Sequence, residues 1–223
     1  VLGQPRSFVM EHAYWGPEFS EAEIRKAIDR ISDFGLRIAE LEEGELVRTV
    51  ARHIADGKIV GWFQGRMEWG PRALGNRSIV VDPRRPEMKD ILNRRIKHRE
   101  PFRPFAPSIL EEYTSQYFEK SHPSPFMLMT YKVRPEKRSV IPAPTHVDGT
   151  GRLQTVDRQT NPLYWQLIKE FEKITGVPVL LNTSFNENEP IVCTPEEGLD
   201  CFLRTKMDVL VMGNYVVEKV QEG

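Results

Sequence analysis

The stretch from Glu68 to Ser78, EWGPRALGNRS, places two arginines among residues that control the path of the backbone. Glycine allows positive φ angles and a close approach of the main chain to a ligand, whereas proline restricts φ. An arginine held on such a turn presents a planar, permanently charged guanidinium to phosphate or carboxylate oxygens. We therefore expect Arg72 and Arg77 to bind an anion. The alternative is a structural turn whose arginines pair with surface carboxylates.

A second cationic stretch, KHREPFRPFAPS (97–108), carries Lys97, Arg99 and Arg103 within seven residues. Its three prolines exclude a regular helix, so we expect an extended chain. In a strand, residues separated by an even number of positions share one face. The three cations would then line one side of a groove, where their mutual repulsion favours a bound polyphosphate. The alternative is a basic surface strand.

The stretch LLNTSFN (180–186) begins with apolar residues and ends with Asn182, Ser184 and Asn186. Polar side chains at the carboxyl end of a strand are typical of the ligand crevice of an α/β protein. Their amide and hydroxyl groups can form hydrogen bonds with a phosphate, a ribose or a carbonyl. A plain Asx or Ser turn is the alternative.

The stretch HVDGTGR (146–152) places His146, Asp148 and Arg152 around a glycine turn. A histidine beside an aspartate could serve as a general base with its orienting partner, although such a pair is more often structural. Arg152 begins a predicted strand and is a further candidate for a phosphate contact.

The charge of the chain is unevenly distributed. The formal net charge is −1, yet residues 66–103 contain eleven Lys or Arg and only five Asp or Glu. This local excess of positive charge suggests that one face binds an anionic partner. Arginines on solvated helix faces would produce the same excess.

Several classes of protein and site are excluded by the sequence. It contains neither GxxxxGK[ST] nor GxGxxG, so a nucleotide site here belongs to another kind. No histidine motif typical of a metal site occurs, and we expect no metal ligands in this chain. No apolar run approaches the roughly 20 residues of a membrane span, and Cys193 and Cys201 fit no metal motif. We expect a cytoplasmic protein and, because the sequence begins with Val1, a piece of a longer one.

The elements that must position these residues are helices and strands without strict alternation. Helices are predicted from apolar residues at helical spacing, with capping boxes at Ser20 and Thr194; they cover 20–31, 45–55, 86–96, 161–175 and 194–205. Short apolar runs predict strands at 58–63, 78–82, 126–133, 178–182, 208–212 and 215–220, and residues 146–156 are predicted to form a turn and then a strand. This order predicts an α/β fold with a twisted, mixed parallel and antiparallel sheet flanked by helices.

Taken together, these stretches resemble the C-terminal domain of the carbamoyltransferase family, which includes the tobramycin and cephamycin O-carbamoyltransferases and nodulation proteins. The matching segments are GWFQGRMEWGPRALGNRSIVVDPR (61–84), NRRIKHREPFRPFAPSI (93–109), HVDGTGRLQTV (146–156) and PVLLNTSFNENEPIVCTPEEGLDCF (178–202). The resemblance implies a YrdC-like fold over residues 45–223, preceded by an arm or linker with one helix over residues 1–44.

The resemblance also implies an activity. The family's C-terminal domain is thought to convert carbamoyl phosphate and ATP, with Mg²⁺, into carbamoyl-adenylate and pyrophosphate. An N-terminal domain of the actin-like ATPase superfamily, with a metal held by histidines, then passes the carbamoyl group to a hydroxyl of the acceptor. That domain is absent from this chain and is its expected partner.

The family's hallmark, a Lys/Arg cluster with a Ser-x-Asn element, matches Lys97 with Arg99 and Ser184 with Asn186. The resemblance implies catalytic roles for Lys97, Arg103 and Ser184. It implies contacts to carbamoyl phosphate and the adenylate for Arg72, Arg77, Arg99, His146, Arg152, Asn182 and Asn186.

Two other functions remain open from the sequence. The basic window could bind RNA, with Trp62, Trp69, Phe102 and Phe105 stacking on bases. Against this, the domain is not basic overall, and such aromatic residues more often fill the core. The domain could instead be a catalytically inactive nucleotide-binding regulatory module.

Overall fold

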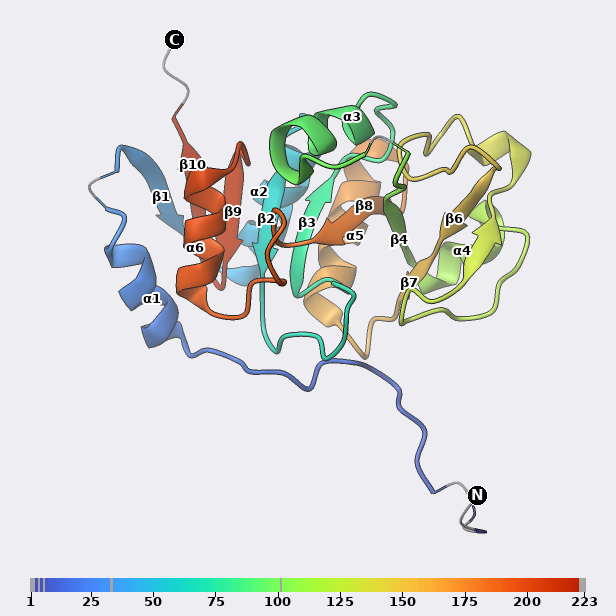
Figure 1. Cartoon of the computed structure of the whole chain (residues 1–223), viewed down its shortest axis with the longest axis horizontal. Coiled ribbons are helices and arrows are strands. Elements are labelled where there is room, and N and C mark those ends of the chain that lie inside the picture. The colour runs from blue at the N-terminus through green and yellow to red at the C-terminus, as the bar shows by residue number, and fades with distance from the viewer. Residues whose placement is uncertain (1–2, 4, 6, 33, 101, 221–223) are drawn as a thin grey trace.

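The computed structural model describes residues 3, 5, 7–32, 34–100 and 102–220. An eight-stranded sheet runs through the molecule in the spatial order β1-β10-β9-β2-β3-β8-β4-β7 (Figure 1). In that order the strands are Leu36–Glu40, Tyr215–Lys219, Val209–Met212, Val60–Phe63, Arg77–Val81, Val179–Ser184, Ala106–Leu110 and Gln154–Val156. The pairs β2–β9 and β4–β7 are parallel, and the other neighbouring pairs are antiparallel. The predicted α/β fold with a mixed sheet is confirmed.

Helices cover both faces of this sheet. On one face α2 (Glu43–Ala55) packs against α5 (Pro162–Thr175), and on the other α1 (Glu21–Asp29) packs against α6 (Pro195–Arg204) (Figure 1). Alternate residues of a strand serve the two layers. In β3, Val80 belongs to the core under α2 and α5, whereas its neighbours face the core under α6. A sheet covered on both faces requires continuous apolar strands, which explains fully buried runs such as β9.

Shorter elements connect these layers. They are α3 (Met88–Leu92), the π-helical turn η1 (Asn93–Lys97), the 3₁₀ turns Glu111–Tyr113 and Pro135–Lys137, α4 (Thr114–Tyr117), and the two-stranded sheet of β5 (Thr130–Lys132) and β6 (Thr150–Arg152). The turn η1 follows α3 directly and ends at His98, whose φ of 43° is left-handed.

The helix boundaries follow the signals expected from the sequence. Ser20 caps α1 and Thr194 caps α6, each in a reciprocal capping box with the glutamate three residues later. The side chain of Asn161 accepts a hydrogen bond from the Tyr164 amide at the start of α5, which ends at the left-handed Gly176.

Three stretches differ from the sequence prediction. Residues 36–40, within the expected N-terminal arm, form β1 and pair with β10. The expected strand at 126–133 is reduced to β5, and Met127 within that stretch has a left-handed φ of 53°. Residues 97–103 do not form one extended strand, since Lys97 ends the η1 turn and the chain then reverses at His98.

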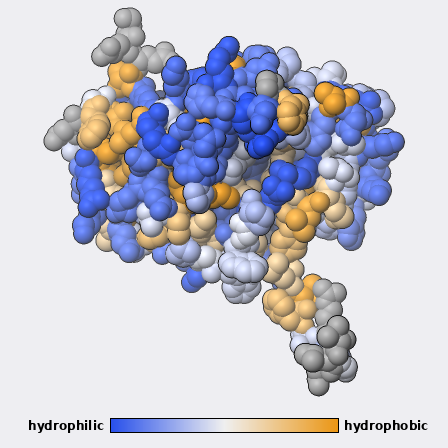
Figure 2. Space-filling model, viewed as in Figure 1, coloured by the Kyte–Doolittle hydropathy of each residue, from blue (hydrophilic) through white to orange (hydrophobic). Residues whose placement is uncertain are grey.

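The residues before α1 cross the molecule as an extended segment and then leave its body (Figure 1). Apolar side chains gather on this segment (Figure 2), where Phe8 and Val9 are both more than half exposed. Strongly hydrophilic residues cover the surface around α3 in the same view. Across the described ranges, none of the helices is long and apolar enough to cross a bilayer.

Candidate active site

The loop between β2 and β3 is organised around a buried carboxylate. One oxygen of Glu68 accepts hydrogen bonds from the amides of Leu74 (2.6 Å), Asn76 (2.8 Å) and Arg77 (3.3 Å). Burial raises the pKa of Glu68 above its ordinary value, and these amides oppose the rise. A Cβ at Gly75, which has a φ of 105°, would overlap the ring of Tyr164. Glycine therefore lets this loop lie directly against α5.

A layer of amide side chains joins the loop to the sheet. Gln154 of β7 donates a hydrogen bond from Nε2 to the Leu74 carbonyl (2.7 Å). Its Oε1 accepts from Ser108 Oγ (2.6 Å) and from Asn182 Nδ2 (3.0 Å). Asn182 Nδ2 also lies 3.2 Å from the Ala73 carbonyl oxygen. Strands β4, β7 and β8 thus fix the carbonyl groups of Ala73 and Leu74, the two residues that follow Arg72.

Three guanidinium groups meet at one small cavity beside this layer. The cavity measures about 80 Å³, and it is lined by Arg72 of the loop, Arg99 after η1, Arg152 of β6, and Asn182, Thr183 and Ser184 of β8, together with apolar residues and prolines. The side chains predicted from four separate stretches of sequence therefore lie together.

These arginines lack counter-charges. Within the described ranges, no carboxylate forms an ion pair with Arg72, Arg99 or Arg152. The Nε atoms of Arg72 and Arg152 and the Oδ1 atom of Asn182 are buried without a hydrogen-bond partner among those residues. Burial lowers the pKa of Arg152, and the nearby charges of Arg72 and Arg99 lower it further. Gathering like charges away from water is unfavourable, so the arrangement is suited to an anion.

Lys97 lies behind the end of β8, almost fully buried. Its Nζ donates to the carbonyl oxygens of Ser184 (2.7 Å) and Asn186 (2.6 Å) and also contacts Asn186 Oδ1 (2.6 Å) and Ser184 Oγ (3.3 Å). Burial lowers the pKa of Lys97 to about 7, and the charge of Arg99 contributes. An ammonium has three donors, so these contacts use its hydrogen-bonding capacity. Lys97, Ser184 and Asn186 thus form one hydrogen-bonded unit at the edge of the cavity.

Arg77 does not reach this cavity. It is fully buried, and its guanidinium donates to the carbonyl oxygens of Gln64 (2.7 Å), Asn76 (3.0 Å) and Gly65 (3.2 Å). The guanidinium carbon lies 3.6 Å from the centre of the Phe63 ring. The expectation of an anion contact is corrected for Arg77: this arginine holds the base of the loop together from inside.

Two further predicted residues lie outside the lining. Arg103 is exposed and pairs with Glu100 through Nε and a carboxylate oxygen 3.0 Å apart. His146 lines a second cavity of about 220 Å³, together with Lys89 and Phe102. Its Nδ1 lies 3.2 Å from Thr150 Oγ1, and burial lowers its pKa. Pro104 lines both cavities, so the second cavity adjoins the first.

The residues that sequence reasoning missed are the supporting ones. Glu68, Ser108 and Gln154 make the hydrogen bonds that position the arginine loop. Gln154 lies in a strand, and its spacing in the sequence does not indicate whether its side chain joins a buried hydrogen-bond network or is exposed to solvent. The role of Glu68 could have been predicted, because a carboxylate before a glycine-rich turn can accept hydrogen bonds from the free amides of that turn.

The chain matches known proteins over most of its length. Residues 51–219 match the family model of the carbamoyltransferase C-terminus. An uncharacterized protein from Synechocystis sp. is 45% identical over 96% of this chain and 38% of its own length. The nodulation protein NolNO from Sinorhizobium fredii is 47% identical over 98% of this chain and 32% of its own length.

A third relative, the nodulation protein NolO from Bradyrhizobium diazoefficiens, is 46% identical over 92% of this chain and 38% of its own length. The chain thus spans about a third of each of these curated relatives. Among solved structures, full-length HypF in its phosphate- and nucleotide-bound form matches 81% of this chain and 23% of its own. Its TM-score of 0.52 at 21% identity shows a shared fold. The match to the family model identifies the chain as a member of the carbamoyltransferase C-terminus family.

Proposed function

We propose that this domain binds carbamoyl phosphate and ATP at the cavity of Arg72, Arg99 and Arg152, and forms carbamoyl-adenylate. The observation that carries the proposal is the convergence of three arginines without a carboxylate partner beside the polar end of β8. A guanidinium binds phosphate through two parallel hydrogen bonds, and a site of this kind is completed by a phosphate group.

The reaction needs cations more than it needs a nucleophilic side chain. One water converts carbamoyl phosphate into carbamate and phosphate. A carbamate oxygen then attacks the α-phosphorus of ATP, the bond to the β-phosphate oxygen breaks, and pyrophosphate leaves. Both substrates are anions, and charge builds on the α-phosphoryl group and the leaving pyrophosphate. Fixed donors aimed at such charge lower a barrier by about 3 kcal/mol each.

In this proposal the two cavities hold different parts of the substrates, as their volumes suggest. A cavity of about 80 Å³ is far below the roughly 300–1,000 Å³ of a site for a whole drug-sized ligand. It suits one phosphate group, and a second cavity adjoins it. In this proposal the nucleoside extends past Pro104 into the second cavity, where Phe102 is exposed and free to stack on the base.

In this proposal, the described residues supply neither the ligands of the metal nor the site for the acceptor hydroxyl. No group of three or more His, Cys, Asp or Glu side chains able to hold a metal ion occurs among the described residues. We propose that Mg²⁺ enters as its complex with ATP. The curated relatives are about three times longer, which supports a second domain that passes the carbamoyl group to a hydroxyl. That domain is proposed to be the N-terminal, actin-like partner implied by the family resemblance.

The test is to incubate the protein with carbamoyl phosphate, ATP and Mg²⁺ and to follow products by ³¹P NMR and mass spectrometry. We expect carbamoyl-adenylate and pyrophosphate in equal amounts, and neither when carbamoyl phosphate is omitted. R152A and R72A should lose the reaction, because each removes an unpaired guanidinium from the cavity. R48A, which removes an exposed arginine of α2, is the matched control.

Product formation that is unchanged in both cavity variants would contradict the proposal. So would the absence of product from the protein joined to the N-terminal domain of a relative. A titration with single-stranded RNA separates the nucleic-acid alternative, since that binding weakens steeply with salt. Trp62 and Phe105 are buried, so only Trp69 and Phe102 of the four aromatic residues considered are exposed for stacking.

A further inference from the structure

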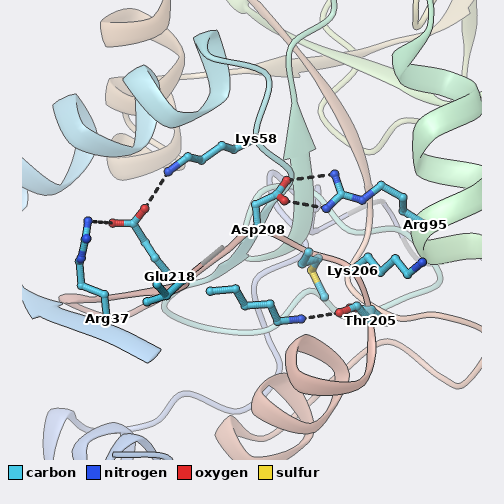
Figure 3. A pocket seen from close by; sticks show the side chains of 10 residues that line it. Arg37, Lys58, Arg95, Thr205, Lys206, Asp208 and Glu218 are labelled. Carbon is cyan, nitrogen blue, oxygen red and sulfur yellow. Dashed lines mark hydrogen bonds and ion pairs between the residues drawn. The ribbon is translucent and has the colours of Figure 1, made fainter. Parts of the chain in front are cut away.

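A larger cavity opens at a different place in the fold. It measures about 560 Å³ and lies where β2 and β9 begin and β10 ends, closed on one side by Arg95 of η1 (Figure 3). It shares no lining residue with the candidate active site. Its charged residues come from five separate segments of the chain, so the fold has to bring them together.

Positive charge exceeds negative charge in this cavity. In the part of the chain that the structure describes, the lining contains two carboxylates, Asp208 and Glu218, and five cations, which are Arg37, Lys58, Arg95, Lys206 and Lys219. Each carboxylate is already engaged, as Figure 3 shows. Asp208 pairs with Arg95 (2.6 Å) and accepts the Ile59 amide (2.7 Å).

Glu218 is shared among several bases. Its carboxylate pairs with Lys58 (2.7 Å), and it also lies near His53 (3.7 Å) and Arg37 (3.9 Å). Hydrogen bonding to Lys58 and the neighbouring positive charges outweigh burial and lower the pKa of Glu218. Among the described residues, neither of these carboxylates forms an ion pair with Lys206 or Lys219.

Two lysines of the lining thus form no ion pair with a carboxylate of the described residues. Lys219 Nζ donates to the carbonyl oxygens of Phe202 (2.7 Å) and Thr205, which supply no negative charge. Burial lowers the pKa of Lys219, although the charge of Asp208 opposes this. The side chain of Lys206 has no hydrogen bond or ion pair with any described residue, and it is exposed at the rim.

We propose that this cavity is a second anion site, for a compact small molecule that carries two or more phosphate charges. The volume lies within the range of small-molecule sites. The described residues of its lining include no aromatic side chain on which a base could stack, which separates it from a site for a nucleobase. Arginine and lysine together suit phosphate oxygens, and a divalent or more highly charged anion would balance the excess.

Inorganic pyrophosphate is the probe for this site. In a ¹⁵N–¹H NMR titration, the amides of Met207, Asp208 and Glu218 are expected to shift with one saturating curve. Reversal of the two rim charges in R37E/K206E should weaken that curve by about tenfold or more. Both side chains are exposed, and the loss of one 3.9 Å ion pair leaves the fold intact.

The matched control is K26E/K120E, which changes the net charge equally at exposed lysines outside both cavities. It should bind pyrophosphate as the unmodified protein does. The R72A variant should also keep the signal at Met207, so failure of the proposed active site leaves this test unaffected. Equal affinity in R37E/K206E and K26E/K120E, or no shift at these three amides, would overturn the proposal.

Discussion

The buried arginines of this domain have different roles: some stabilise the fold and others are available to bind an anion. The Nε atoms of Arg72, Arg77 and Arg152 are all buried without a partner among the described residues. The terminal nitrogens of Arg77, however, donate to backbone carbonyl oxygens and so serve the fold, whereas no such hydrogen bond engages the side chain of Arg72 or Arg152 within the described ranges. All three are arginines in basic, glycine-containing stretches. Sequence alone gives them the same expectation, because the difference lies in which backbone carbonyls the fold brings within reach.

The buried ammonium of Lys97 makes the stability of the domain depend on pH. Burial lowers its pKa to about 7 from an unfolded value near 10.5. Between these values the unfolded chain binds more protons, so the free energy of unfolding rises with pH through this lysine. We predict that urea denaturation shows this rise between pH 7 and 9 in the native protein and a smaller one in K97M.

The window ends at pH 9 because Cys201 acts in the opposite direction above it. Burial raises the pKa of its thiol to about 12, so the unfolded chain loses that proton first and stability falls. Lys120, which is exposed, supplies the control variant K120M. An equal pH dependence in K97M and K120M would show that Lys97 stays charged in the folded protein.

Substitution of Arg77 tests whether this side chain stabilises the loop instead of binding an anion. R77A leaves the carbonyl oxygens of Gln64 and Gly65 without their buried donor and removes the contact with Phe63. We predict a loss of about 3 kcal/mol in the free energy of unfolding, measured by urea denaturation. A variant of unchanged stability that nevertheless loses phosphate binding would restore Arg77 to the ligand site.

At the scale of elements, the loop of Arg72 depends on glycine for two separate reasons. Gly75 and Gly176 both have left-handed φ angles, 105° and 73°. A Cβ at Gly176 would meet nothing within 4 Å, whereas one at Gly75 would meet the Tyr164 ring. The comparison therefore separates backbone strain from steric overlap.

We predict that G176A costs about 1 kcal/mol of stability, from strain alone. G75A should cost about 2 kcal/mol more, because overpacking adds to the strain. G75A should also weaken phosphate binding, since the loop must move away from α5 and carries Arg72 with it. Thermal and urea denaturation of the two variants provide the measurement, and equal losses would refute the steric argument.

The helix ends were the elements best predicted from the sequence, because the residues that fix them are close together in the chain. The capping boxes of Ser20 and Thr194 and the left-handed Gly176 are satisfied within a few residues of the chain. β1 was missed because its stability comes from pairing with β10, nearly 180 residues later in the chain. The spacing of Lys97, Arg99 and Arg103 suggested one strand, whereas Lys97 ends a π-helical turn and the chain reverses at the left-handed His98. The candidate site was predicted where side-chain type was sufficient and missed where the network of Gln154 decides the geometry.

At the scale of the whole molecule, the segment before α1 is part of the support of the site. The Ala13 carbonyl accepts from the Trp69 amide (2.6 Å), and the backbones of Gly16 and Met67 are joined by a hydrogen bond of 2.9 Å. Tyr14 donates its hydroxyl to the Leu74 carbonyl (2.8 Å). The extended segment therefore holds both sides of the loop that presents Arg72.

This arrangement predicts different effects for two truncations. Removal of residues 1–17 eliminates these contacts but no strand of the sheet, so the domain should stay folded while the loop loses its anchor. Misplacement of a binding group by about 1 Å can reduce a rate by about a hundredfold, and we expect at least a tenfold loss of phosphate affinity. Removal of residues 1–10 retains every one of these hydrogen bonds, and the shortened protein should bind as the full chain does.

Calorimetry measures the affinities, and hydrogen exchange should rise at residues 67–76 in the longer truncation only. Equal binding by both truncations would show that the sheet alone positions Arg72. A loss confined to the longer truncation would mean that displacement of the segment before α1 changes the anion site.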